Sequence, residues 1–261
     1  MPADSALFEQ AADLLAPAQS MLFITGAGIS ADSGLPTYRG VGGLYDGGET
    51  EEGMPIEVCL SGQVLRSAPE ITWKYIRQIE QACRGAQPND AHRLIAAIEK
   101  RRERVWVLTQ NVDGLHAAAG SEKLIEIHGN TRGLRCMACR WRAQVDDYVD
   151  LDASVPRCPE CGAVIRPDVI LFGEMLPSAA ITTLGRELDQ GFDAVISIGT
   201  SAVFPYISGP IHQARHEGKA TLEINPGDSD ISDRVDLHLR LGAAEAMRGI
   251  WAALERRWGH A

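Results

Sequence analysis

The sequence lacks the marks of a membrane or secreted protein. None of its apolar runs reaches the roughly 20 residues that a membrane-spanning helix needs. Its first residues carry no charged segment followed by an apolar core, and residues 1–19 instead show the spacing of an amphipathic helix, with Leu7, Leu14 and Leu15 on one stripe. We therefore expect no membrane contact and a cytoplasmic location.

A basic surface is also missing. The 261 residues carry a formal net charge of −10, and no lysine-rich tail or basic face is visible. Nucleic-acid binding depends on clustered Lys and Arg that neutralise phosphates, so we expect no direct nucleic-acid partner. An acidic body suits basic partners such as lysine-bearing peptides, and we expect a monomer.

Short apolar runs with helical patterns between them indicate the fold class. Near-continuous apolar runs followed by polar or glycine residues are typical of parallel strands covered on both faces. The runs are residues 21–25, 105–109, 124–127, 194–198, 221–224 and 237–241, and the helical patterns include 91–100, 179–188, 207–217 and 244–257. The alternation predicts an α/β fold with a doubly wound parallel sheet.

Two stretches do not fit this sheet and predict a smaller inserted lobe. Residues 40–88 are glycine-rich and then helical, and residues 131–166 are short, polar and turn-rich. We assign residues 1–39, 89–130 and 167–261 to the sheet domain. Residues 40–88 then form a helical module, and 131–166 form a separate ribbon.

Four of the six cysteines form two CxxC pairs, Cys136 with Cys139 and Cys158 with Cys161. Eighteen residues separate the pairs, which is the spacing of a four-cysteine zinc ribbon, and four thiolates complete the tetrahedron of a structural Zn²⁺. His128 lies only eight residues before Cys136, but such a site leaves no position for it. We do not expect the remaining cysteines to be ligands.

The segment Gly26-Ala27-Gly28-Ile29-Ser30-Ala31 follows a predicted strand and matches the dinucleotide fingerprint G-x-G-x-x-A. Its glycines permit a tight turn and a close approach of backbone to pyrophosphate at a helix N-terminus. A structural glycine turn is the alternative. The continuation differs from a dehydrogenase, because no acidic strand end follows about twenty residues on. A group for the ribose could come from residues 223–226 instead.

Seven stretches together resemble the sirtuins, the NAD-dependent protein deacylases. They are GAGISADSGLPTYRG (26–40), TQNVDGLH (109–116), IHG (127–129), the paired CxxC, RPDVILFGE (166–174), GTS (199–201) and EINP (223–226), in the family's order across nearly all of the chain. The resemblance implies a Rossmann-like NAD domain, a small lobe of zinc ribbon and helical module, and a cleft between them. It implies lysine deacylation, in which the acyl group passes to ADP-ribose and nicotinamide is released.

The resemblance also implies which positions bind NAD and substrate. A cofactor-binding loop would run over residues 31–45, with Tyr in place of the family's Phe at position 38. Acyl-lysine proteins or peptides would enter a tunnel lined by Val169, Leu171 and Phe172. The positions implied for NAD are Gly26, Ala27, Gly28, Ser30, Tyr38, Arg39, Gln110, Asn111, Asp113, Gly199, Thr200, Ser201, Asn225 and Ala244.

His128 is the candidate catalytic base, with Asn111 and Asp113 holding the ribose and the carboxamide. Histidine suits this task because its pKa lies near the working pH, and His128 ends a predicted strand, where α/β sheets place ligands. A purely structural strand-end histidine is the alternative, and Asp113 could also cap a helix before Leu115. The other histidines fit helix faces or surface positions better.

The acyl preference depends on the small-lobe helix. The sirtuin branch that removes succinyl and malonyl groups carries a Tyr-x-x-Arg pair there. One register places Ile76 and Ile79 at the pair and another places Lys74 and Arg77, so neither restores it. We therefore expect a preference for uncharged acyl groups, acetyl first.

Three other functions compete with deacylation. Protein ADP-ribosylation would use the same NAD site. A non-catalytic NAD-binding module would not need His128, Asn111 and Asp113. Hydride transfer is disfavoured because the acidic ribose anchor is missing.

Overall fold

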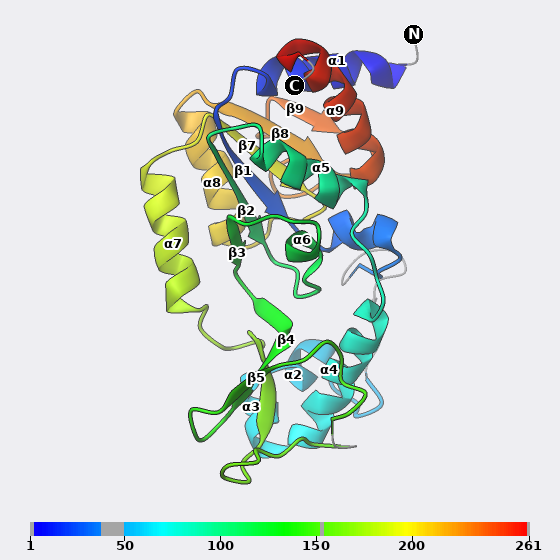
Figure 1. The fold of residues 1–261 in the computed structure, drawn as a ribbon, viewed down its shortest axis with the longest axis vertical. Coiled ribbons are helices and arrows are strands. Elements are labelled where there is room, and N and C mark those ends of the chain that lie inside the picture. The colour runs from blue at the N-terminus through cyan, green and yellow to red at the C-terminus, as the bar shows by residue number, and fades with distance from the viewer. Residues whose placement is uncertain (1–2, 38–49, 152–153, 260–261) are drawn as a thin grey trace.

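The computed structural model describes residues 3–37, 50–151 and 154–259, which form two lobes (Figure 1). A six-stranded parallel sheet lies in the larger lobe, and a three-stranded antiparallel sheet lies with short helices in the smaller one. This confirms the predicted fold class. Among the described residues, none of the helices combines the length and apolar character that crossing a membrane demands.

All six predicted strands occur in the large sheet. Its order is β3-β2-β1-β7-β8-β9, and every neighbouring pair is parallel. The strands are β1 (Ser20–Thr25), β2 (Arg104–Thr109), β3 (Leu124–Glu126), β7 (Ala194–Ile198), β8 (Ala220–Ile224) and β9 (Leu237–Leu239). The chain winds outward from β1 in one direction and from β7 in the other, so β1 and β7 flank the point where the winding reverses.

Helices cover both faces of this sheet. Because side chains alternate along a strand, Met21 and Phe23 of β1 face one apolar cluster with α1, α5 and α9, whereas Leu22 and Ile24 face a second cluster with α7 and α8. The helices are α1 (Ala3–Leu15), α5 (Asp90–Glu99), α6 (Leu115–Ala118), α7 (Ser178–Asp189), α8 (Pro205–His216) and α9 (Ala243–Trp258). Burial on both faces explains why the strands read as unbroken apolar runs.

The small lobe packs short helices against a small sheet of order β5-β4-β6. Its elements are α2 (Ile56–Cys59), α3 (Gly62–Ser67), α4 (Pro69–Cys83), β4 (Gly129–Cys136), β5 (Arg142–Gln144) and β6 (Ile165–Val169). Trp73 of α4 is fully buried at its centre, where its indole Nε1 donates to the carbonyl of Ile165 at 2.9 Å. The domain limits predicted at 130/131 and 166/167 fall inside β4 and β6.

The chain passes from one sheet to the other at Gly129. Strand β3 ends at Glu126 and β4 begins at Gly129, so only Ile127 and His128 lie between the sheets. Gly129 has φ +79°, and a Cβ there would lie 1.9 Å from the carbonyl oxygen of Asp168. The crossing therefore requires glycine.

Candidate active site

The site forms where β1, β2 and β7 end, beside the winding reversal, which is the usual ligand position in open α/β sheets. The loops after β1 and β7 touch through their backbones. Gly28 N–H donates to the carbonyl of Gly199 at 2.8 Å, and a Cβ on Gly28 would lie 2.6 Å from the Gly199 Cα. Glycine at both positions keeps side chains out of the floor of the site.

The segment after Gly26 is a 3₁₀ helix, η1 (Ala27–Ser33), rather than the α-helix of a dinucleotide fold. It ends after two turns because Gly34 takes a left-handed conformation (φ 81°) and Pro36 follows. Tyr38 and Arg39, assigned to the cofactor-binding loop, lie outside the described residues.

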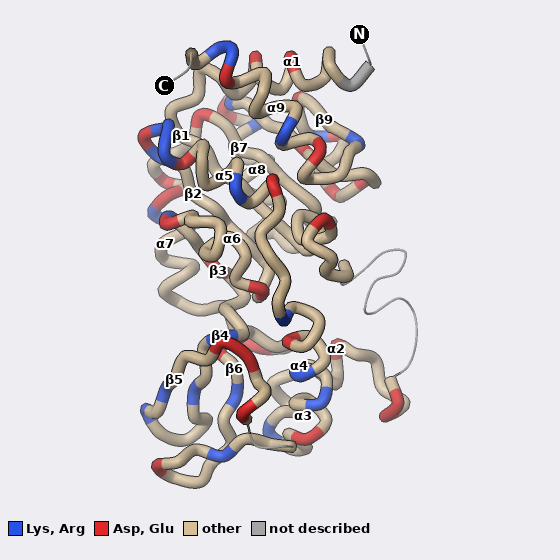
Figure 2. The backbone as a smooth tube through the Cα atoms, turned by 45° about the vertical axis from the view of Figure 1, so that its right-hand side comes forward, with Lys and Arg blue, Asp and Glu red and all other residues tan. Residues whose placement is uncertain are grey.

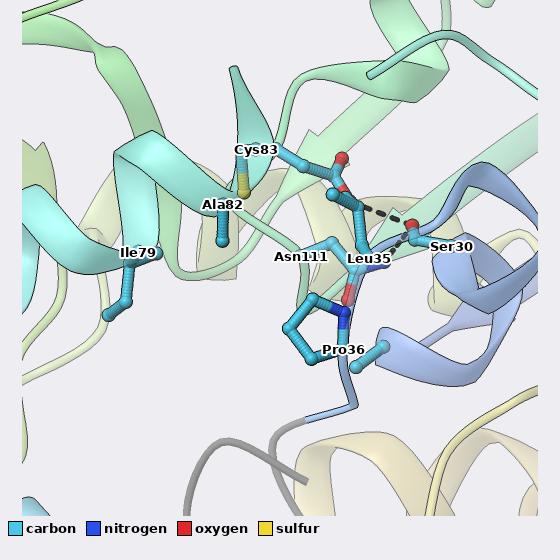
Figure 3. Close-up of a pocket in the computed structure, with 9 residues that line it drawn as sticks. Ser30, Leu35, Pro36, Ile79, Ala82, Cys83 and Asn111 are labelled. Atoms are coloured by element: carbon cyan, nitrogen blue, oxygen red, sulfur yellow. Dashed lines mark hydrogen bonds between the residues drawn. The ribbon is translucent and has the colours of Figure 1, made fainter. Parts of the chain in front are cut away.

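Three predicted residues form one buried polar chain. Asn111, only 4% exposed, donates from Nδ2 to the carbonyl of Gly26 at 3.1 Å and to Ser30 Oγ at 3.2 Å. Ser30 Oγ in turn donates to Asp113 Oδ2 at 2.8 Å (Figure 3). Asp113 also accepts from the backbone N–H of Leu115, the first residue of α6, at 2.9 Å, although the N-cap position of this helix is Gly114 and not Asp113. Burial raises the pKa of Asp113.

A second group of predicted residues lies around Thr200. Gln110 Nε2 donates to Thr200 Oγ1 at 2.8 Å, and Asn225 Nδ2 donates to the Thr200 carbonyl at 3.1 Å. Ser201 is exposed beside them. Ala244 lies farther along, where its backbone N–H donates to Asp32 Oδ2 at 2.9 Å and joins the start of α9 to η1.

His128 is joined to the end of β2. Its Nδ1 lies 2.9 Å from the carbonyl oxygen of Gln110, and its Nε2 lies 2.9 Å from Tyr206 Oη. A carbonyl only accepts hydrogen bonds, so Nδ1 carries the proton and Nε2 holds the lone pair of the neutral ring. Burial lowers the pKa of His128, and the Gln110 hydrogen bond opposes this shift. The ring is therefore unprotonated at neutral pH and can act as a base.

The sequence reasoning missed the aromatic pair on His128. Phe204 and Tyr206 stack at 5.4 Å between ring centroids, and both meet the His128 ring edge-on, at 6.4 and 6.1 Å. Both follow the Gly199-Thr200-Ser201 turn at the carboxyl end of β7. The strand-end rule could have drawn attention to them.

A cavity lies against the buried polar chain (Figure 3). Ile79, Ala82 and Cys83 of α4 line one side, and Ser30 and Asn111 line the other. Its remaining lining residues are Ala27, Leu35, Pro36 and Asp113. Sequence reasoning missed the α4 residues, since nothing in their spacing separates a helix face that lines a site from one that packs in a core.

The three residues assigned to the acyl-lysine tunnel differ in exposure. Val169 and Leu171 are buried in the small-lobe core, whereas Phe172 is 41% exposed. Phe172 N–H donates to the carbonyl of Leu60 at 3.0 Å, and its own carbonyl accepts from Gly62 N–H at 3.1 Å. The tunnel assignment stays a prediction.

The four paired cysteines come together in the small lobe. Their Sγ atoms all lie within 4.8 Å of one another, with Cys136 and Cys161 at 3.4 Å and Cys139 and Cys158 at 3.6 Å. A tetrahedron of thiolates about 2.3 Å from zinc has edges of about 3.8 Å, so the cluster fits one Zn²⁺. His128 is not part of it, as predicted.

A profile of the Sir2 family matches residues 26–205, which include the glycine loop, His128, the cysteine cluster and the β7 loop. The chain belongs to the Sir2 family. "NAD-dependent protein deacylase 2" of Pseudomonas syringae pv. tomato is 52% identical over 91% of this chain and 96% of that protein. The Pseudomonas aeruginosa protein of the same name is 50% identical over 90% and 93%.

Solved Sir2 structures share the whole architecture. A Sir2 homologue in complex with NAD aligns with a TM-score of 0.85 at 34% identity, covering 96% of this chain and 95% of that one. A Sir2 protein with a deacetylated peptide and acetyl ADP-ribose aligns with a TM-score of 0.83 at 30% identity, covering 94% and 97%.

The residues present fit NAD as well as zinc. Position 26 requires glycine, because a Cβ there would lie 2.7 Å from the Thr200 Cβ. The floor of the site is therefore bare backbone, which a ligand can approach closely. The buried amide of Asn111, the buried hydroxyl of Ser30 and the half-buried carboxyl of Asp113 line the adjoining cavity. This Sir2 chain thus offers both the bare backbone for phosphates and the polar groups for a ribose.

Proposed function

We propose that this protein is an NAD-dependent protein lysine deacylase that acts best on acetyl-lysine. The observation that supports this most strongly is His128, a half-buried neutral histidine at the strand ends, whose Nε2 holds a lone pair. The two Pseudomonas relatives named as deacylases, at 52% and 50% identity, support the assignment.

NAD would lie over Gly26, Ala27, Gly28 and Ser30, and its remaining contacts would come from the Gln110–Asp113 segment, from Gly199 to Ser201, and from Asn225 and Ala244. When bound, NAD supplies a sugar–nicotinamide bond whose loss exposes a carbon that even an amide oxygen can attack. The protein's part is orientation. Asn111 and Asp113 are held by Ser30 in fixed positions, so little ordering remains to be done on binding.

His128 would act as the general base. Because burial lowers its pKa, Nε2 is unprotonated at neutral pH and can take a proton from a ribose hydroxyl. The Nδ1–H bond to the Gln110 carbonyl holds the ring in place and stabilises the imidazolium that forms. A general base in this position contributes about 10²–10⁴ to the rate.

Zinc would have a structural role. Cys136, Cys139, Cys158 and Cys161 use all four positions of a tetrahedral ion, which leaves none for water or substrate. The ion would fix β4 and β6 and so support the wall made by Val169, Leu171 and Phe172, which we propose lines the acyl-lysine tunnel.

The cavity supports a preference for uncharged acyl groups. None of its described lining residues is an Arg or Lys that could pair with the carboxylate of a succinyl or malonyl group. Ile79 lines this cavity, whereas Arg77 donates to the carbonyl of Tyr148 and stacks over Trp73. Because Ile79 and not Arg77 reaches the cavity, we favour the alignment in which Ile76 and Ile79 replace the Tyr-x-x-Arg pair of the branch that removes succinyl and malonyl groups.

The test is to incubate the protein with NAD and matched acetyl, longer apolar and succinyl lysine peptides, and to quantify nicotinamide and free peptide. We expect acetyl loss to match nicotinamide release. Faster desuccinylation would contradict the acyl preference, and mass analysis showing ADP-ribose on protein would assign transferase activity instead. Unchanged nicotinamide release by His128→Ala would contradict the role of His128.

We also propose a cytoplasmic monomer without a nucleic-acid partner, divided into the lobes predicted above. The net charge is −10, and Lys or Arg and Asp or Glu occur together on both lobes (Figure 2). The four clustered thiols suit a reducing compartment. Size-exclusion chromatography with light scattering would test the monomer.

A further inference from the structure

The Nε2 lone pair of His128, which the proposed general-base role requires, is already in a hydrogen bond. Tyr206 Oη lies 2.9 Å from Nε2, and Nδ1 carries the ring's single proton because it faces the Gln110 carbonyl. Tyr206 must therefore be the donor. Burial raises the pKa of Tyr206, so its hydroxyl stays protonated.

The local chain fixes Tyr206 in this position. Pro205 starts α8 with a locked φ, which places Phe204 just before the helix and Tyr206 in its first turn. The two rings stack nearly parallel, 11° apart, and both meet His128 edge-on. Two aromatic contacts of the Tyr206 ring, with Phe204 and with His128, thus hold its hydroxyl beside Nε2.

We propose that Tyr206 is a positioning residue that caps Nε2 of His128 in the ligand-free protein and is displaced by a hydroxyl of the ligand. The proposal rests on the proposed function, in which His128 takes a proton from a ribose hydroxyl. An imidazole nitrogen has one in-plane lone pair, so Tyr206 and the ligand hydroxyl compete for it. The cap keeps the reactive tautomer populated while no ligand is present, and its displacement makes binding weaker than the other contacts allow.

The test compares Tyr206→Phe, which keeps the ring and loses the hydroxyl, with Phe204→Leu, which loses the stacking ring and keeps the hydroxyl. The first readout is the ¹⁵N chemical shift of His128 Nε2 in ligand-free protein. Tyr206→Phe should shift it toward the value of an unprotonated nitrogen without a donor, and Phe204→Leu should leave most of the hydrogen-bonded shift in place.

The second readout is the affinity for ADP-ribose, measured by calorimetry without turnover. Tyr206→Phe should bind about threefold to tenfold more tightly, as expected when a net hydrogen bond no longer has to be broken. An unchanged Nε2 shift would overturn the proposal, because no cap would exist in solution. Weaker ADP-ribose binding, or a tenfold fall in kcat, would also overturn it, since Tyr206 would then stay bonded and take part in the reaction.

Failure of the proposed function has a different signature. Wild-type protein that binds no ADP-ribose or removes no acyl group would contradict deacylation. The Nε2 shift would still show whether Tyr206 caps His128.

Discussion

The two lobes differ in what holds them together. The large lobe packs two layers of helices on a six-stranded sheet, and most members of its main apolar cluster are 0% exposed. The small-lobe cluster has 14 buried residues, most of them between 1 and 8% exposed, and two of them are also zinc-ligand cysteines, Cys136 and Cys158. Apolar burial can stabilise the first lobe alone, whereas the second has too little core and needs the ion.

The two lobes also contribute different parts of the proposed site. The proposed base and most of the predicted NAD contacts come from the ends of large-lobe strands. The small lobe supplies the Ile79–Cys83 side of the cavity and the predicted acyl tunnel. Damage to the small lobe should therefore affect acyl-peptide turnover more than nucleotide binding.

The strongest test of this difference is Cys136→Ser. Losing one thiolate should release the zinc, whose binding to small domains is worth about 10–16 kcal/mol, and should unfold the small lobe. Deacylation should be lost, while ADP-ribose affinity measured by calorimetry stays within about tenfold, a change of about 1.4 kcal/mol, because most of the predicted NAD contacts lie in the large lobe. Zinc is counted by atomic absorption.

Glu160→Gln is the control for this variant. The Glu160 carboxylate lies 3.7 Å from Cys139 Sγ but does not belong to the cluster, so zinc and activity should remain. Loss of ADP-ribose binding together with zinc in Cys136→Ser would show that the large lobe does not fold without the small one.

The converse variant, His128→Ala, should lower deacylation at least about hundredfold, because it removes the general base. The zinc content should stay at one per chain. His212→Ala, which changes an exposed histidine of α8, should turn over normally. Zinc loss in His128→Ala would show that the two lobes are not separable in this way.

Acid should weaken the large lobe through a buried histidine pair. His92 and His116 meet edge-on at 4.8 Å, and neither His92 nitrogen has a partner among the described residues. Burial lowers the pKa of His92 to about 4 and that of His116 well below 6.5. The unfolded chain therefore binds more protons below about pH 6.5, so stability falls as pH drops from there toward 4.

The loss from His92 alone approaches about 3 kcal/mol near pH 4, and urea unfolding between pH 7 and 4 would measure it. Zinc release in acid also destabilises the protein, but it is common to wild type and His92→Leu. The difference between the two therefore isolates the histidine. Parallel pH profiles for both proteins would contradict the assignment.

The smallest expected effects distinguish two amides of the large lobe. Asn111→Ala removes two hydrogen bonds beside the cavity and should lower kcat/KM about tenfold to hundredfold. Asn225→Ala removes one bond to Thr200 and should act mainly on the KM for NAD, by about threefold to tenfold. Equal effects of the two changes on kcat/KM would contradict their different places in the site.

The sequence predicts the large lobe well because its signals are local. Each parallel strand is buried on both faces, which leaves an unbroken apolar run such as Ala194–Ile198, and the cysteine spacing alone defines the metal cluster. The helix expected after the glycine loop is a 3₁₀ helix, η1, and the fingerprint does not specify this form because it is shared with folds in which an α-helix follows.

The missed site residues depend on tertiary packing. Ile79 and Cys83 face the cavity only because α4 packs beside the η1 loop, and no periodicity in the helix marks that face. Tyr206 meets His128 across 78 residues of sequence, and the helix predicted over 207–217 begins two residues earlier, at Pro205, so that it includes Tyr206. The uncertain register on α4 could likewise be judged only from which side chain reaches the cavity.

Gly129 has a consequence for anyone who screens random substitutions in this protein. It contributes no side chain to catalysis, metal binding or either core, yet any Cβ there would meet the Asp168 carbonyl at 1.9 Å. In a deep mutational scan, position 129 should be as intolerant as His128 next to it. A map of mutational sensitivity would then show one peak over two neighbouring residues with different causes. His128 would be intolerant because it transfers a proton, and Gly129 because its backbone lies against that of Asp168.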